Sequence, residues 1–198
     1  MTAPSPDDIR GLHEKYAPSA EAFDLVFTHC EIVWSIAEQL IAESDCAVDA
    51  GLVRAGCLLH DIGVYRLYGP DGVLDQQSYV QHGVLGHEIL VEEGFPEELC
   101  RFCSSHTGVG LTKQDVERQR LPLSPADYLA VTAEEQLVMY ADKFHSKTTP
   151  PKFVTADSYA TYVSRYGDEK VAAFHALRNT FGAPNLAELA AAHQHALA

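Results

Sequence analysis

Hydrophobic residues recur at helical spacing over much of the chain. The longest such pattern runs from Ala20 to Glu43 and predicts a helix with one apolar face. Its apolar positions are Phe23, Val26, Phe27, Cys30, Val33, Trp34, Ala37 and Leu40. Alternating patterns typical of strands are scarce, so the sequence favours an all-α fold.

Proline, glycine and capping residues divide the rest of the chain into shorter segments. Gly94 ends one predicted helix, and the pair Thr132 and Glu135 forms a capping box at the start of another. The segment from Gly63 to Ser78, with the turn GPDG, predicts a loop. Besides 20–43, the predicted helices cover about 6–16, 47–60, 79–93, 96–106, 112–119 and 132–146, and three more follow with breaks at Gly167 and at GAPN.

Length and composition predict one globular domain over residues 1–198. The 198 residues suffice for a single core, and 46% of them are hydrophobic. No apolar stretch reaches eighteen residues, which argues against a membrane span. The N-terminal MTAPSPDD lacks the basic and apolar regions of a secretion signal, so we expect a cytoplasmic protein.

The formal net charge of −14 limits the classes of partner. Such a charge repels nucleic acid polymers and anionic membranes, so neither is expected as a partner. A small phosphorylated substrate is still compatible, because bound metal ions can invert the local field. A homodimer is also compatible with the sequence.

The five cysteines are an odd number, which indicates free thiols in a cytoplasmic chain. Cys100 and Cys103 form the motif CRFC, with His106 three residues beyond. A structural zinc site usually has four ligands from two such pairs, and the chain has no second pair. The two cysteines are therefore interpreted as small apolar residues of a helix, and Cys30 and Cys57 as core residues.

Six ionisable residues lie on apolar helix faces or at helix ends: His29, His60, Asp61, His82, His106 and Asp142. The pair His60 and Asp61, in CLLHDIGVY, directly follows an apolar run. Each residue alone is more typical of a hydrogen-bonded core residue than of a metal ligand. Six together indicate a metal site, because burying several ionisable groups without a cation costs on the order of several kcal/mol for each.

The order H…HD…H…H…D resembles the HD superfamily of metal-dependent phosphohydrolases. The matching segments are LLHDIG, HGVLGHEIL, SSHTG and YADK, together with His29, and they span residues 29 to 142. The wider run also resembles small stand-alone HD proteins. The resemblance implies an all-α, HD/PDEase-like helical bundle with the metal site between central helices. It places a metal-binding core at about 20–147 and leaves a C-terminal helical extension over about 156–198.

The family pattern implies two metal sites that share Asp61 as a bridging ligand, since a carboxylate offers two oxygens. The first would also take His29, His60 and Asp142, and the second His82 and His106. Mixed nitrogen and oxygen ligands suit one or two divalent ions of Fe, Mn, Co, Ni or Zn better than Mg. His87 is an alternative to His82, but it lies five residues further along the helix and so points elsewhere.

The chain also departs from the family pattern. Val64 follows HDIG where the superfamily often has lysine, and Arg66 comes two residues later. No Gly-Tyr-Pro signature follows the doublet, which argues against the cyclic-dinucleotide phosphodiesterase branch. The HTG and AD elements resemble enzymes that split diadenosine tetraphosphate, but the segment between them is longer and different here.

The resemblance and the ligands predict hydrolysis of a small phosphate ester, nucleotide or phosphoanhydride through a metal-activated hydroxide. The predicted catalytic residues are Asp61, Lys143 and Arg66. Candidate phosphate contacts are Arg66, Lys113, Lys143 and Lys147, of which Lys143 is the strongest because it directly follows a predicted ligand.

Two alternatives use the same ligands and stay open. One is a dinuclear-iron oxygenase, and the other is a non-catalytic, metal-stabilised binding protein. Outside the motif, His193 and His195 lie in an alanine-rich segment and are expected to face solvent.

Overall fold

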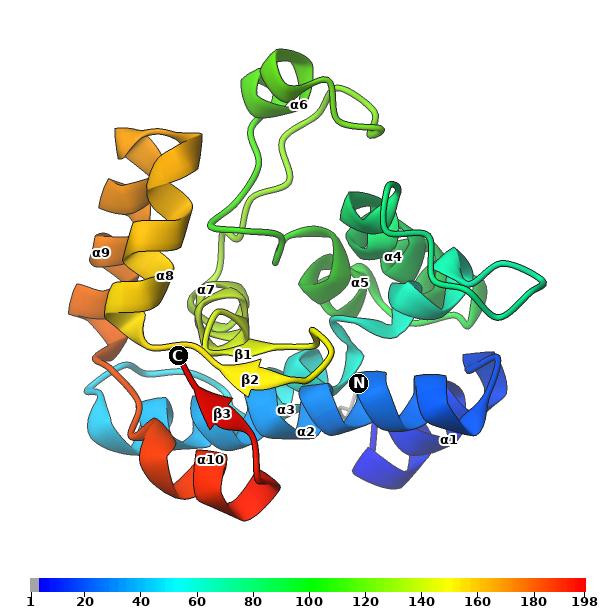
Figure 1. Cartoon of the computed structure of the whole chain (residues 1–198), viewed down its shortest axis with the longest axis horizontal. Coiled ribbons are helices and arrows are strands. Elements are labelled where there is room, and N and C mark those ends of the chain that lie inside the picture. Colours follow the sequence, from blue (N-terminus) through cyan, green and yellow to red (C-terminus); the bar gives the residue numbers. More distant parts are fainter. Residues whose placement is uncertain (1–3) are drawn as a thin grey trace.

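The computed structural model describes residues 4–198, and helices dominate it (Figure 1), which confirms the predicted all-α fold. The α-helices are α1 (Pro6–Tyr16), α2 (Ala20–Glu43), α3 (Ala50–Leu59), α4 (His82–Glu92), α5 (Glu97–Ser104), α6 (Lys113–Gln119), α7 (Ala133–Asp142), α8 (Ala156–Val163), α9 (Asp168–Phe181) and α10 (Leu186–His193). Short 3-10 helices are η1 (Ile62–Leu67), η2 (Tyr79–Gln81) and η3 (Ser164–Tyr166). Three two-residue strands are β1 (His145–Ser146), β2 (Lys152–Phe153) and β3 (Ala196–Leu197).

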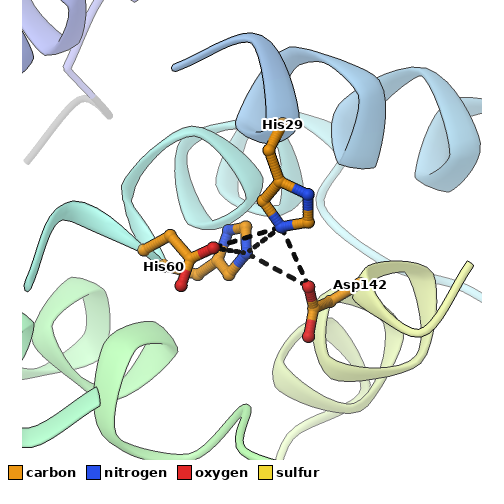
Figure 2. Close-up of side chains that lie close together, drawn as sticks. His29, His60 and Asp142 are labelled. Carbon is orange, nitrogen blue, oxygen red and sulfur yellow. Dashed lines mark hydrogen bonds and ion pairs between the residues drawn. The ribbon is translucent and has the colours of Figure 1, made fainter. Parts of the chain in front are cut away.

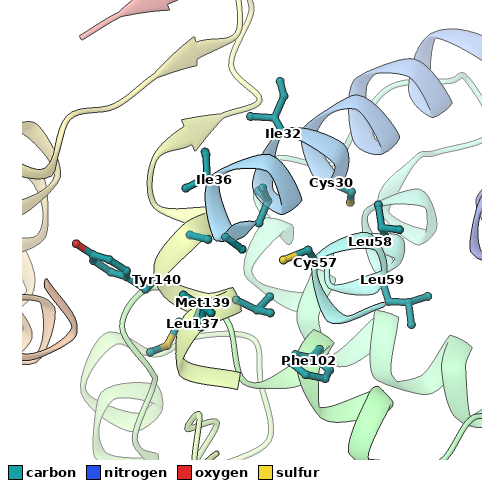
Figure 3. Close-up of a cluster of buried hydrophobic side chains, with 14 of the residues drawn as sticks. Cys30, Ile32, Ile36, Cys57, Leu58, Leu59, Phe102, Leu137, Met139 and Tyr140 are labelled. Carbon is teal, nitrogen blue, oxygen red and sulfur yellow. The ribbon is translucent and has the colours of Figure 1, made fainter. Parts of the chain in front are cut away.

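The long helix α2 is central to the fold and packs against α3 and α7. Most of its predicted apolar positions are buried, namely Val26, Phe27, Cys30, Val33, Ala37 and Leu40. Ile32 and Ile36 are buried as well, because α2 is covered on more than one side. Side chains of α2, α3, α5 and α7 meet in this cluster (Figure 3). The cluster extends from Ile9 in α1 to Ala190 in α10, which supports the proposed single domain.

By length and composition, α2 is also the one described helix that could cross a membrane. Its most apolar eighteen-residue window has a mean hydropathy of 1.2, and half of that window is buried inside the protein. The core helix of a globular protein meets the same criterion, so this feature is only weak support for a membrane span.

The limits of several helices differ from the prediction; for example, the first residues of the helix expected over 79–93 form the 3-10 helix η2, and α4 begins at His82. α3 begins later than expected, at Ala50, because the Asp49 carboxylate accepts hydrogen bonds from the backbone N–H groups of Gly51 and Leu52. The helix expected over 132–146 ends at Asp142, and its last residues form β1 instead. The expected loop over 63–78 begins with the 3-10 helix η1.

A small sheet of order β1-β2-β3 joins the C-terminal segment to the rest of the fold. β1 pairs antiparallel with β2, and β2 pairs parallel with β3, so that His145 lies opposite Phe153 and Phe153 opposite Leu197. The expectation that His193 and His195 face solvent is wrong. Both are half-buried, because this pairing draws the segment into the fold, and His195 contacts His145.

His13 of α1 is buried where α1 meets α3 and η1. Its Nε2 lies 2.8 Å from the carbonyl oxygen of Leu58, and its Nδ1 lies 2.9 Å from the hydroxyl of Tyr65. A neutral ring satisfies both contacts, since Nε2–H donates to the carbonyl and Nδ1 accepts from the hydroxyl. Burial is the largest cause that lowers the pKa of His13 to about 4.

We expect His13 to make the protein less stable as the pH falls from 6.5 to 4. In this range the unfolded chain binds a proton at His13 that the buried ring does not bind. The free energy of unfolding should therefore decrease as the pH decreases, by up to roughly 3 kcal/mol from this residue. His13→Gln keeps an N–H donor but cannot titrate, so its free energy of unfolding should fall less steeply. Urea titrations of both proteins with chelator at several pH values measure this difference, and parallel curves would contradict it.

Candidate metal centre

The six side chains predicted as metal ligands converge from five helices. They are His29 in the middle of α2, His60 and Asp61 at the end of α3, His82 at the start of α4, His106 just beyond α5 and Asp142 at the end of α7. The Asp142 side chain is 15% exposed, and the other five residues are buried. Their ligand atoms form two groups, each within 4.8 Å, and Asp61 belongs to both groups.

The first group consists of His29, His60, Asp61 and Asp142 (Figure 2). His29 Nε2 lies 3.1 Å from Asp61 Oδ2 and 3.0 Å from Asp142 Oδ1. His60 Nε2 lies 3.3 Å and 3.5 Å from the same two oxygens, and 3.3 Å from His29 Nε2. Two nitrogens and two carboxylate oxygens thus face one another, and transition metals accept this mixed donor set.

The second group consists of Asp61, His82 and His106. The Nε2 atoms of the two histidines lie 2.9 Å apart, and they lie 3.5 Å and 3.6 Å from Asp61 Oδ1. This carboxylate oxygen is buried and has no hydrogen-bond partner within the described part of the chain. A buried oxygen without a partner is costly, and a cation beside it would remove that cost.

The Nδ1 atoms of three histidines determine what their Nε2 atoms present to the centre. The Nδ1 atoms of His60, His82 and His106 lie 2.8, 2.6 and 2.7 Å from backbone carbonyl oxygens three residues earlier. A carbonyl only accepts, so each Nδ1 carries a hydrogen, and in a neutral ring each Nε2 presents a lone pair. In the second group two lone pairs then face each other across 2.9 Å and repel. A metal ion between them would turn this repulsion into ligation, so the residues present fit a metal.

The charges of the ligands also suit a metal. Burial alone would raise the pKa of Asp61, but the opposing effects, led by the charge of Lys147, hold it well below its ordinary value. The pKa of Asp142 is likewise held well below its ordinary value, mainly by Lys143, against the effect of burial. Burial lowers the pKa of His82 to about 3. At neutral pH the carboxylates are charged and this imidazole is neutral, as metal binding requires.

His60 behaves differently from His82. Burial is the largest single effect and lowers its pKa, but the charge of Asp61, together with Cys30 and the hydrogen bonds to Asp142 and Asp61, holds the pKa well above its ordinary value. A proton on His60 Nε2 and a metal ion would compensate the same carboxylates. Metal binding to the first group should therefore release a proton from His60.

Each group contributes ligands to the wall of a cavity of about 720 Å³: Asp61 and Asp142 of the first group, and Asp61, His82 and His106 of the second. This volume is in the range of small-molecule sites. Four of the six lysines of the chain line the cavity, namely Lys143, Lys147, Lys152 and Lys170. Four tyrosines line it as well, namely Tyr79, Tyr159, Tyr162 and Tyr166.

Two of the four candidate phosphate contacts lie at the centre. Lys147 forms an ion pair with Asp61 Oδ2. Lys143 Nζ lies 2.5 Å from Asp142 Oδ2 and donates to the carbonyl oxygen of His106 at 2.9 Å. Both ammonium groups thus lie beside candidate metal ligands and on the cavity wall.

The other two candidates lie away from the ligands. Arg66 pairs with Glu88 and Glu92 of α4 and lines a separate surface depression, because η1 directs its side chain along α4. Lys113, at the start of α6, lies 4.0 Å from Glu117 and has a largely exposed side chain. Neither residue is retained as a phosphate contact, and Arg66 is not retained as a catalytic residue.

Sequence reasoning missed His145, which is buried and contacts His29. A signal was present in its spacing, because His145 follows Asp142 by three residues and would share its face in the expected helix. The tyrosines and Lys170 of the cavity belong to no motif and could not be assigned in advance.

His87 lies apart from the two groups. Its Nδ1 lies 3.1 Å from the hydroxyl of Ser104, and its Nε2 lies 3.3 Å from a carboxylate oxygen of Glu97. His82, by contrast, faces Asp61 and His106. This arrangement supports the interpretation of His82, rather than His87, as the ligand.

We expect His82→Ala to lose the metal ion of the second group and to retain that of the first. The variant removes one of only three donors in the second group, whereas the first group keeps all of its own. His87→Ala is the matched control and should retain the metal content of the wild type. Elemental analysis of the purified proteins measures this. Loss of one equivalent from His87→Ala, with none from His82→Ala, would reverse the assignment.

Comparisons with known proteins point to one family. The sequence profile described as the HD domain matches residues 26–147, which include all six candidate ligands. An uncharacterised protein of Methanocaldococcus jannaschii is 42% identical over 120 residues, which is 59% of this chain and 64% of that protein. A tRNA (cytidine(56)-2'-O)-methyltransferase of Picrophilus torridus is 33% identical over 129 residues, which is 65% of this chain and 33% of that enzyme. The chain thus spans less than two thirds of the length of these curated relatives.

Solved structures show a similar fold. The HD domain of the L. monocytogenes phosphodiesterase PgpH has a TM-score of 0.56 to this chain, at 17% sequence identity, and the match covers 96% of this chain and 100% of that one. The same domain in complex with cyclic-di-AMP has a TM-score of 0.55, again at 17% identity, over 95% and 98% of the two chains. Because the family profile covers more than half of the sequence, the chain belongs to the HD domain family.

Proposed function

We propose that the chain is a metal-dependent phosphohydrolase that acts on a small phosphate ester, nucleotide or phosphoanhydride. The observation that carries the proposal is the position of Asp61 between two groups of histidine nitrogens, with one carboxylate oxygen directed to each group. One or two divalent transition metals bound there would supply a water of lowered pKa as the nucleophile and positive charge beside the phosphoryl oxygens.

The residues of the chain divide the remaining tasks. Asp61 would hold both metal ions, and Asp142 would complete the first group. Lys143 and Lys147 have ammonium groups beside these carboxylates, where they could contact phosphoryl oxygens and neutralise developing charge. The metal-activated water would be the nucleophile, so no nucleophilic side chain is required. The Cys30 thiol is a poor nucleophile in any case, because burial raises its pKa and so disfavours the thiolate.

The charge of the cavity supports a phosphorylated substrate. The whole chain has a net charge of −14, yet four lysines line this one cavity. The buried Lys170 is paired with Asp115, whereas Lys143 and Lys147 lie beside the candidate ligands Asp142 and Asp61, and Lys152 also lines the cavity, so these three are the best placed contacts. The HD domain of PgpH, which has a similar fold, is solved in complex with cyclic-di-AMP, a small phosphorylated ligand, and this supports the same class of substrate.

The tyrosines of the cavity favour a nucleotide among the candidate substrates. The rings of Tyr159, Tyr162 and Tyr166 follow one another on α8 and η3, with centroid separations of 5.9 Å and 6.0 Å. Tyr162 and Tyr166 are 46% and 38% exposed. Exposed aromatic faces of this kind suit a planar base, which gains about 1–3 kcal/mol from stacking on such a ring.

Hydrolysis in ¹⁸O-labelled water tests the proposal. We expect phosphate release from a panel of nucleotides and phosphoesters to stop with chelator and to return with Mn²⁺ or Co²⁺, and the label to enter the phosphate product in a single turnover. His87→Ala serves as the active control. A requirement for O₂ would favour the dinuclear-iron oxygenase instead. Tightly bound metal without turnover of any phosphorylated compound would favour the non-catalytic binding protein.

A further inference from the structure

One of the four candidate histidine ligands is held differently from the other three. The Nδ1 atoms of His60, His82 and His106 contact backbone carbonyl oxygens. The Nδ1 of His29 instead lies 2.8 Å from Nδ1 of His145. The orientation of His29 therefore depends on a side chain from β1, more than a hundred residues away in the sequence.

The contact continues from His145 to His195. Nε2 of His145 lies 3.1 Å from Nδ1 of His195, and the two rings stack with centroids 5.2 Å apart. The rings of His29 and His145 also stack, with centroids 5.1 Å apart. His145 is buried, and the ring of Phe153 packs edge-on against it at 5.0 Å. The small sheet thus fixes His145, since β1, β2 and the approach to β3 each contribute one of these rings.

One arrangement of hydrogens satisfies this row of three neutral rings while His29 acts as a ligand. His29 must present a lone pair from Nε2, so its Nδ1 carries the hydrogen and donates to Nδ1 of His145. His145 then carries its hydrogen on Nε2 and donates to Nδ1 of His195. Each ring donates toward the C-terminal segment and accepts from the side of the centre.

We propose that His145, supported by His195, is a positioning residue that fixes the tautomer and the ring plane of His29 and thereby strengthens metal binding by the first group. The inference rests on the proposed metal centre. His145 is not itself a ligand, because it contacts the ring nitrogen of His29 that is directed away from Asp61 and Asp142. Partners of this kind typically change the metal affinity of a site by about 10- to 100-fold.

The test compares two replacements of similar size. His145→Asn keeps an acceptor oxygen near the position of Nδ1, whereas His145→Leu fills the space without any acceptor. Equilibrium dialysis of Mn²⁺ or Co²⁺ against a competing chelator gives the affinity of each group. We expect His145→Leu to lower the affinity for one of the two metal ions by about 10- to 100-fold and to leave the affinity for the other unchanged. His145→Asn should remain within a few fold of the wild type.

Two further variants keep the test independent of folding defects. His195 lies at the less buried end of the row. His195→Leu should therefore lower the affinity for the same metal ion, by less than His145→Leu does. His175→Leu replaces an exposed histidine of α9 and should change neither affinity. Wild-type affinities for both metals in His145→Leu and His195→Leu would overturn the proposal, and so would equal losses in His145→Asn and His145→Leu. A wild-type protein that binds no metal would instead overturn the metal centre itself.

Discussion

Replacing Asp61 by alanine is expected to remove both metal ions and to abolish the proposed hydrolysis. Each group would lose a carboxylate oxygen, because Asp61 Oδ2 faces the first group and Oδ1 faces the second. The second group would keep only two neutral imidazoles, which cannot balance the charge of a divalent ion. We expect the affinity for each metal to fall by more than about 100-fold, since even partners that merely support a ligand change affinity by that amount.

Asp142→Ala is the matched control for Asp61→Ala. It removes a carboxylate from the first group alone, so it should lose one metal equivalent and retain the other. Elemental analysis and competition with a chelator measure both variants, and circular dichroism checks that each is folded. If Asp61→Ala retained two equivalents of metal, the bridging role of Asp61 would be wrong.

Gly63→Ala is expected to cause a large loss of stability. A Cβ atom at Gly63 would lie 2.0 Å from the carbonyl oxygen of His82 and 2.2 Å from the backbone nitrogen of Gly86. Both contacts involve the backbone of α4, so no side-chain rotation can relieve them, and η1 must move away from α4. We expect the free energy of unfolding to fall by about 3 kcal/mol or more, which is the upper range for overpacking.

Gly11→Ala is the control for this effect. A Cβ atom at Gly11 would meet nothing within 4 Å, and Gly11 lies inside helix α1. Alanine there should raise the free energy of unfolding by about 0.5–1 kcal/mol. Urea unfolding with chelator present compares the two variants. A Gly63→Ala protein as stable as the wild type would show that η1 and α4 do not approach as closely as described.

The helices could largely be predicted from the sequence, because their signals are local. The bounds of α1 and α2 agree with the prediction, since a capping serine precedes each helix and apolar residues repeat along one face. The capping box of Thr132 and Glu135 is likewise confirmed at the start of α7. Such signals involve residues only three or four positions apart, so they are visible without knowledge of the fold.

The sheet and its consequences could not be predicted in the same way. Strands of two residues have no alternation to detect, and β2 pairs with β3 across the whole of α8, α9 and α10. The contact of His195 with His145 follows from that pairing alone. Arg66 illustrates the opposite case, because it is close to Asp61 in sequence while η1 directs it to Glu92.

The lysines of the cavity have a consequence for how fast a charged substrate arrives. At 0.1 M salt the Debye length is about 10 Å, so the charges of the protein that lie further than this from an approaching anion are largely screened. In dilute buffer it would instead experience the net charge of −14 and be repelled before it reached the ammonium groups of Lys147 and Lys152. Added salt should therefore first accelerate the encounter, by weakening the long-range repulsion. At higher salt the short-range attraction is weakened as well, so the association rate of a polyanion should pass through a maximum at intermediate ionic strength.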